Sequence, residues 1–172
     1  MKFELRSWLC AGVTASALAL GAVPAFAAGS GDDVTKAAVY NGLTLDQMKS
    51  IITSAGASTS DLGDNTVRIA DGPLVQLTQC PPEEKGVCYE IQIERTFSNV
   101  KPPLDAVNKW NSDTKIPEAS IDDNGHLHLE FWVTTVGITA PLLIDSIGWF
   151  EGAWQDESSQ QFWAPYMKGA GT

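Results

Sequence analysis

The sequence predicts an α+β domain in which helices pack on one side of an antiparallel sheet of about five strands. Apolar residues recur at helical spacing in three stretches, which begin near residues 45, 104 and 140. Between these stretches, apolar and polar residues alternate with the period of two that is typical of a half-buried strand. The order is helix, three strands, helix, two strands, helix, and one sheet covered on one side buries all of these apolar faces.

The first helix is expected to begin directly after Thr44. Thr44 and Gln47 have the spacing of a capping box, in which each side chain bonds the backbone N–H of the other residue. Gly56 supplies the stop signal. The residues that share the apolar face of this helix are Leu45, Met48, Ile51, Ile52 and Ala55.

Three strands are expected next, over 66–70, 74–79 and 87–94. The first two flank an Asp-Gly-Pro turn, and the third alternates apolar and polar residues without interruption. Cys80 and Cys88 lie at the two bases of the loop before the third strand, both on the polar face of the pattern. In an oxidising compartment they are expected to form one structural disulfide that closes about nine residues.

The second half of the chain is expected to hold two helices and a second hairpin. A short helix over 104–111 follows two prolines, and its apolar face consists of Leu104, Val107 and Trp110. Strands over 116–121 and 126–136 flank an Asp-Asp-Asn-Gly turn. Thr139 is expected to cap a last helical region that runs towards Tyr166. The candidate points for a kink or break in it are Gly148, Gly152 and residues 156–159.

Residues 1–27 are expected to be a cleavable secretory signal peptide. Lys2 and Arg6 give a positive start, an apolar run follows, and an Ala-Phe-Ala triplet provides the small-x-small pattern that signal peptidase accepts. Cleavage is expected between Ala27 and Ala28. The apolar run is too short for a good membrane anchor, so the protein is expected to be periplasmic or secreted.

Cleavage would leave a flexible, glycine-rich segment over 28–42, the α+β domain over 43–166 and a short tail over 167–172. The whole chain has a net charge of −10, and removal of Lys2, Glu4 and Arg6 with the leader leaves −11. Nucleic-acid binding needs clustered Lys and Arg, and an acidic surface is repelled by anionic membranes. We therefore expect neither a nucleic-acid partner nor membrane association of the mature chain.

His126, His128 and Glu130 share one face of the last predicted strand and are the candidate metal ligands. Two imidazoles and a carboxylate suit zinc or copper. The alternative is an ordinary polar strand face, which we favour because a His-x-His pair needs a further ligand. A calcium loop at 122–125 is disfavoured, since Asn-Gly between alternating strands predicts a hairpin turn. No metal or other cofactor is predicted.

The chain contains six tryptophans, a high number for one small domain. Those at helical spacing with other apolar residues are expected in the core. Trp132, Trp149 and Trp163 are the candidates for an exposed interaction surface, although burial in the core is the favoured interpretation for each of them taken singly. Trp110 is expected to be a buried anchor of its helix, and Asn111 a polar cap at the helix end.

The sequence contains none of the motifs that mark common catalytic sites. It has no nucleophile elbow, no phosphate-binding glycine loop, no H-E-x-x-H, and no thiol nucleophile outside the expected disulfide. A hydrolase assembled from scattered Ser and Asp residues is the minority alternative. We therefore predict that the protein is not an enzyme, and we assign no catalytic or cofactor-binding residues.

Several short stretches together resemble the YbjN-domain family of bacterial proteins. They are Leu43-Thr44-Leu45, Gly56, Cys80, Cys88, Phe97, Val107-Asn108-Lys109-Trp110-Asn111, Ala119-Ser120-Ile121-Asp122 and Gly137-Ile138-Thr139. The likeness covers about residues 43–166. It implies a fold like that of type III secretion chaperones and a place among proteins described as sensory-transduction regulators, without established catalytic residues. The leader departs from the cytosolic members.

These observations predict a non-enzymatic module of the cell envelope that binds another protein or a peptide, as a monomer or a homodimer. The alternative is a small-ligand or metal-binding protein that uses His126, His128 and Glu130.

Overall fold

The computed structural model describes residues 38–114 and 116–167, so the expected leader, its cleavage site and most of the expected tail lie outside the described residues. The helices are α1 (Leu45–Ser54), α2 (Leu104–Asp113), α3 (Ala140–Gln155) and α4 (Glu157–Trp163), with 3₁₀ turns η2 (Pro82–Glu84) and η3 (Ala164–Tyr166). The strands are β1 (Val39–Asn41), β2 (Thr59–Gly63), β3 (Thr66–Ile69), β4 (Leu74–Thr78), β5 (Glu90–Phe97), β6 (Glu118–Ile121), β7 (Leu127–Thr134) and β8 (Val136–Thr139). The predicted α+β class is confirmed.

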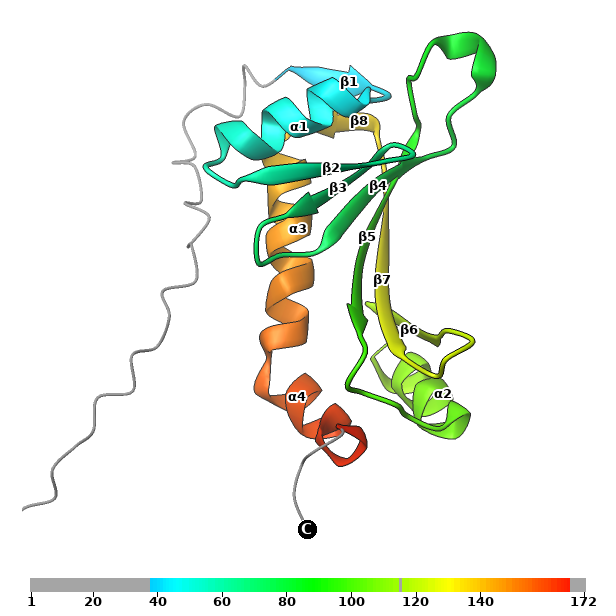
Figure 1. Cartoon of the computed structure of the whole chain (residues 1–172). Coiled ribbons are helices and arrows are strands. Elements are labelled where there is room, and N and C mark those ends of the chain that lie inside the picture. The colour runs from blue at the N-terminus through cyan, green and yellow to red at the C-terminus, as the bar shows by residue number, and fades with distance from the viewer. Residues whose placement is uncertain (1–37, 115, 168–172) are drawn as a thin grey trace, which may run out of the picture.

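Six strands form one antiparallel sheet in the order β2-β3-β4-β5-β7-β6, and β1 pairs with β8 in a separate two-stranded sheet. Figure 1 shows α3 and α4 following the length of the large sheet on one side, with α2 beside β6 at its far end. The helix-facing side chains of β5 and β7 are buried or half-buried, whereas the alternate side chains lie on a polar face. Arg95 of β5 ties the sheet to α3 through an ion pair with Glu151, at 2.8 Å between Nη2 and Oε1.

The first helix begins where the sequence predicts. The Gln47 backbone N–H donates to Thr44 Oγ1 over 3.3 Å, and the Thr44 backbone N–H donates to Gln47 Oε1 over 2.9 Å. Both halves of the predicted capping box are therefore present. The apolar face of α1 buries Met48, Ile51 and Ile52.

The sheet has one strand more than the predicted five, because β2 carries no apolar alternation that a sequence pattern could reveal. Its residues are mostly exposed, and it pairs with β3 alone at the edge of the sheet. The single strand expected over 126–136 ends earlier, because β7 stops at Thr134. A separate strand, β8, begins at Val136 and pairs with β1 instead of the large sheet. Since β1 is formed by Val39–Asn41, the end of the segment that was expected to be flexible is ordered.

The last helical region breaks at Asp156, within one of the three predicted points. The Asp156 side chain accepts a hydrogen bond from the Ser158 backbone N–H over 3.0 Å, and in this way caps α4. Gly148 and Gly152 remain inside α3. At the start of α3, Thr139 Oγ1 accepts from the Leu142 backbone N–H, which confirms the predicted cap.

Trp110 and Asn111 connect α2 to β6. The Trp110 Nε1–H donates to the Pro117 carbonyl over 2.8 Å, and the indole is buried as predicted. Asn111 does not cap the helix: its amide bonds both the N–H and the C=O of Ala119, at 2.7 and 2.9 Å. It thus satisfies the backbone of an edge strand. Leu104, which was expected on the buried face, is 60% exposed because it lies in the first turn of α2.

Within the described residues, no helix is long and apolar enough to cross a membrane.

Candidate functional site

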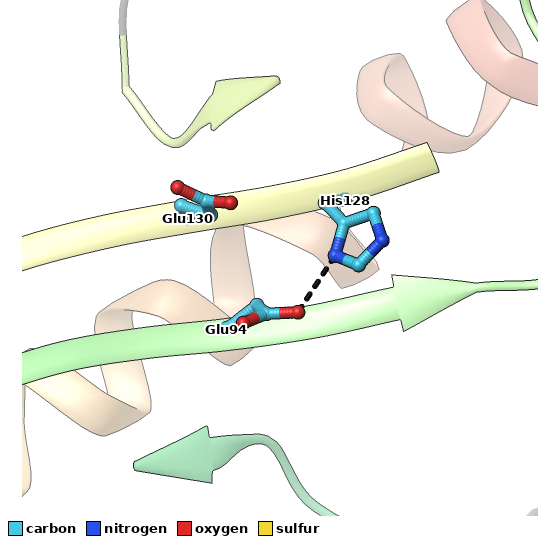
Figure 2. Close-up of side chains that lie close together, drawn as sticks. All are labelled: Glu94, His128 and Glu130. Carbon is cyan, nitrogen blue, oxygen red and sulfur yellow. Dashed lines mark hydrogen bonds and ion pairs between the residues drawn. The ribbon is translucent and has the colours of Figure 1, made fainter. Parts of the chain in front are cut away.

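The polar face of β5 and β7 gathers acidic residues around one histidine. The register places Glu94 opposite Glu130, and β6 places Glu118 opposite Glu130 on the other side. Three glutamates therefore form a row across three neighbouring strands. His128 lies two residues before Glu130 on β7, on the same face. Figure 2 shows the His128 ring turned towards Glu94, with Glu130 beside them on β7.

We call Glu94, His128 and Glu130 the polar-face cluster. One ligand atom of each lies within 4.8 Å of the others, and all three side chains are half-buried. His128 Nδ1 lies 2.7 Å from Glu94 Oε1. The arrangement combines one imidazole with two carboxylates, which is the chemistry of a divalent-metal site or of a proton-sharing pair.

Asp122 sits at the end of this cluster, in the turn between β6 and β7. Its Oδ1 accepts from the backbone N–H groups of His126 and Asn124, both at 2.8 Å. Its Oδ2 lies 2.9 Å from His126 Nδ1 and 3.8 Å from His128 Nε2. The hydrogen bond from the His126 backbone, followed by those from its ring and from Asn124, holds the pKa of Asp122 well below its usual range.

Of the three candidate metal ligands, His128 and Glu130 come together and His126 does not. His126 Nδ1 is bonded to Asp122 instead, and the group whose donor atoms lie within 4.8 Å of one another contains His128 but not His126. Glu94 takes its place, and it was not predicted because it comes from β5. Its position on the polar side of an alternating strand was visible in the sequence, but the register that sets it opposite Glu130 was not. The loop at 122–125 forms the expected turn.

Glu130 carries an electrostatic cost at neutral pH. Burial, and then the nearby Glu94 carboxylate, raise the pKa of Glu130, while Ser120 and His128 oppose the shift. Because the pKa is higher in the folded than in the unfolded chain, this group stabilises the fold below its unfolded pKa. That contribution is lost as the pH rises through the folded pKa.

Glu130→Gln is therefore expected to raise the melting temperature at pH 7 by about 1–2 °C, in chelator-treated protein. The gain should vanish near pH 3, well below the pKa of an unfolded glutamate, where wild-type Glu130 is itself protonated in both states. Differential scanning calorimetry at the two pH values measures this. Glu118→Gln, an exposed residue in the same row, should change the melting temperature less; an equal gain from both variants would contradict a role for burial.

A pocket of about 340 Å³ adjoins the cluster on the side of β3 and β4. It is lined by Arg68, Leu74 and Glu94, with residues 95–98 at the end of β5. The pocket thus shares Glu94 with the polar-face cluster, and two arginines, Arg68 and Arg95, line its wall together with this carboxylate.

The second candidate region is the edge of β7. The Thr135 backbone N–H donates to the Tyr89 carbonyl, so these two opposite residues form a hydrogen-bonded pair. In an antiparallel ladder every second pair is of this kind. The next hydrogen-bonded pairs are therefore Ile91 with Val133 and Ile93 with Phe131. On β7 the intervening residues, such as Trp132 and Thr134, direct their backbone N–H and C=O groups away from β5. On that side β6 covers His128 and Glu130, but it begins at Glu118, opposite Glu130.

The backbone N–H and C=O groups of Trp132 and Thr134 therefore lie on an edge that no strand covers within the described residues. We call residues 131–134 the open edge. Figure 1 shows the half of β7 beyond β6 without a neighbour on its outer side.

Aromatic side chains flank the open edge on both faces of the sheet. Trp132 lies on the polar face and is 43% exposed. On the other face, Phe131 packs against Trp149 of α3, with ring centroids 5.0 Å apart, and Trp149 is 48% exposed. Two of the three tryptophans that were candidates for an interaction surface thus lie beside the same edge.

Trp163 was also a candidate for that surface, and this alternative is wrong; the residue lies in the core, as was favoured for each tryptophan. Its side chain is fully buried and contacts Trp110, Phe162 and Tyr166. The reason is that α4 turns back at Asp156 and packs its apolar side towards α2.

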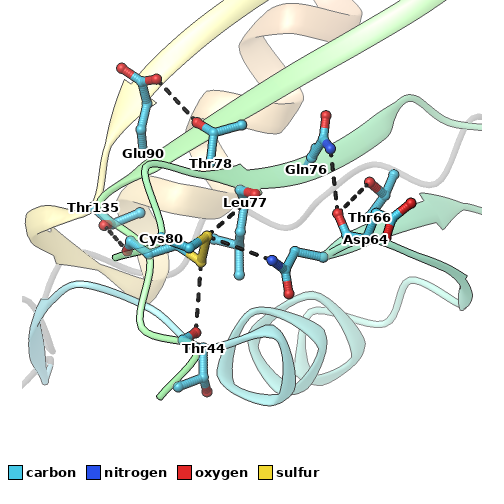
Figure 3. Close-up of a disulfide and its surroundings, with 12 residues drawn as sticks. Thr44, Asp64, Thr66, Gln76, Leu77, Thr78, Cys80, Glu90 and Thr135 are labelled. Atoms are coloured by element: carbon cyan, nitrogen blue, oxygen red, sulfur yellow. Dashed lines mark hydrogen bonds between the residues drawn. A yellow bond between two sulfur atoms is a disulfide. The ribbon is translucent and has the colours of Figure 1, made fainter. Parts of the chain in front are cut away.

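The predicted disulfide between Cys80 and Cys88 is present, with 4.1 Å between the Cα atoms (Figure 3). Its expected position on the polar face is wrong, because Cys88 is fully buried. It pairs with Leu43 through two backbone hydrogen bonds of 2.9 and 2.8 Å, and both residues belong to the buried core. The bond thus fastens the loop containing η2 to the core.

Comparisons of the chain with protein-family models, with curated proteins and with solved structures give no significant match.

Proposed function

We propose that the protein is a non-enzymatic peptide-binding module of the cell envelope. An extended segment of a partner protein would add to the open edge of β7 as a further antiparallel strand. The observation that carries the proposal is the pair of outward-facing backbone positions at Trp132 and Thr134. Exposed strand edges pair readily with another chain, and proteins that do not use them usually shield them with charges, prolines or bulges.

The side chains around the open edge suit such a strand. Successive residues of an added strand would face opposite sides of the sheet. One set would contact Trp132, and the other would contact Phe131 and Trp149. Aromatic side chains are enriched at the centres of protein interfaces, because they bury a large apolar area at a small entropic cost.

The acidic charge of the polar sheet face favours a basic peptide. The row of Glu94, Glu130 and Glu118 ends next to the open edge, and the chain as a whole carries −10. A segment in which apolar and basic residues alternate would be complementary to it. A second copy of the chain is disfavoured as occupant, since its edge carries the same acidic row.

The envelope location and the family are parts of the same proposal. The leader pattern over 1–27 supports export to the periplasm or beyond, and the disulfide is compatible with an oxidising compartment. The resemblance to YbjN-domain proteins implies relatives of chaperone-like fold, which hold partner chains.

A random heptapeptide library displayed on phage, screened against the purified protein, tests the binding function. Enriched sequences are expected to lack proline and to alternate apolar and basic residues. A synthetic peptide of the most enriched sequence should bind with an affinity that falls at higher salt. A library without enrichment, or with enrichment of acidic sequences, would contradict the proposal.

Two substitutions at one position locate the binding site. Thr134→Pro removes the outward N–H, which an edge strand tolerates, and should weaken the selected peptide at least tenfold. Thr134→Val removes the hydroxyl but keeps the N–H, and should bind within about twofold of wild type. Circular dichroism shows whether each variant is folded. If Thr134→Pro does not fold, Trp132→Ala replaces it, with the same expected loss of affinity. Equal binding by the folded edge variant and wild type would place the peptide elsewhere.

A further inference from the structure

We propose that the polar-face cluster is a site for a divalent transition-metal ion, with Zn²⁺ as the preferred ion. Glu94 from β5, and His128 and Glu130 from β7, would supply the ligands. The site goes beyond the proposed peptide binding and does not depend on it.

The donor atoms have the spacing that such an ion requires. They lie within 4.8 Å of one another, and His128 Nδ1 and Glu94 Oε1 are 2.7 Å apart. Ligands at about 2.0–2.2 Å from a tetrahedral Zn²⁺ are about 3.3–3.6 Å apart, so small rotations of the glutamates complete the geometry. Two neighbouring strands hold the backbones of all three residues in fixed register.

The donor chemistry selects the class of ion. One imidazole nitrogen and two carboxylate oxygens suit zinc and its neighbours, whereas calcium and magnesium prefer sites of oxygen ligands alone. Three protein ligands leave a fourth tetrahedral position for water or a small anion.

Asp122 supplies an independent observation in favour of a ligating His128. His128 Nε2 is buried without a hydrogen-bond partner in the described part of the chain, and Asp122 Oδ2 lies 3.8 Å from it. When one nitrogen of a histidine binds a metal, the other usually donates to a carboxylate that fixes the tautomer. Asp122 is held in position by two backbone N–H groups and needs only a small shift to accept that bond.

The local charge also favours a cation. Glu94, Glu130 and Glu118 follow one another across three strands. Among the described side chains, the basic group within hydrogen-bond distance of this row is His128. A divalent ion would offset the repulsion between the half-buried Glu94 and Glu130 carboxylates.

Isothermal titration of chelator-treated protein with ZnCl₂ at pH 7.5 tests the site. One equivalent is expected to bind, and Co²⁺ in its place should give the visible absorption of a tetrahedral or five-coordinate site. His128→Ala should weaken Zn²⁺ at least 100-fold and abolish the Co²⁺ band. Glu94→Gln should weaken Zn²⁺ at least tenfold, and Asp122→Asn by about 10–100-fold. Binding of less than 0.2 equivalents by wild type would overturn the proposal.

His126→Ala is the matched control, because His126 lies two residues from His128 but bonds Asp122. It should bind Zn²⁺ within about threefold of wild type. A loss as large as that of His128→Ala would show an exposed His-x-His chelate instead and overturn the assignment. All variants should keep the circular dichroism of wild type; if His128→Ala does not, His128→Gln takes its place with the same expected loss.

Discussion

Replacing Trp163 with alanine is expected to lower the free energy of unfolding by about 3–5 kcal/mol, the largest effect of any single change considered. The indole is fully buried, and its ring lies 5.1 Å from that of Trp110 and 4.7 Å from that of Phe162. Its removal leaves a cavity between α4 and α2. The two helices are connected at both ends to the rest of the fold, so they cannot move together far enough to fill it. Urea unfolding monitored by circular dichroism measures the change.

Trp149→Ala is the matched control for Trp163, since it deletes the same side chain from the same helical region. The Trp149 indole is 48% exposed and contacts Phe131 alone among the aromatic rings described. Its loss should cost about 1 kcal/mol or less. Equal losses from the two variants would contradict the placement of Trp163 in the core and Trp149 on the surface.

Removing the disulfide is expected to cost about 2–3 kcal/mol of unfolding free energy. The bond joins residues eight positions apart, and a loop of this length gives that value in the chain-entropy model. The Cys80→Ala, Cys88→Ala double variant tests this without placing a hydroxyl in the core, where Cys88 is fully buried. Its melting temperature should fall by roughly 10 °C.

Dithiothreitol separates loss of the bond from loss of the side chains. Wild-type protein should lose a similar amount of stability on reduction, whereas the double variant should not respond to the reductant. A wild-type melting temperature that is the same with and without dithiothreitol would show that the bond contributes nothing to stability.

Local signals in the sequence were enough to predict the elements that carry them. The capping box at Thr44 and Gln47 and the cap at Thr139 rest on residues three positions apart, and both are present. The turn at 122–125 was found for the same reason. In contrast, β2 is polar and exposed along most of its length, and its existence depends on backbone pairing with β3, which leaves no pattern in the residue types.

The candidate sites depend on contacts between residues that are far apart in the chain. The sequence predicted these contacts only in part. His128 and Glu130 were found because they lie on one strand. Glu94 required the register of β5 against β7, and the open edge required knowledge of where β6 begins. The sequence could not decide between surface and core for Trp163, because burial of an aromatic residue depends on which helix packs over it. Cys88 was misplaced because it pairs with Leu43, which lies 45 positions before it in the chain and leaves no signal in the local alternation.

Amide hydrogen exchange measured by NMR, with and without the peptide selected from the library, tests the central claim most directly. In the free protein the backbone N–H groups of Trp132 and Thr134 should exchange rapidly, while that of Val133, bonded to β5, should be protected. Saturation with the peptide should slow exchange at Trp132 and Thr134 at least tenfold and leave Val133 unchanged. Protection by the peptide at other residues, with Trp132 and Thr134 still exchanging at their free rates, would contradict strand addition at the open edge.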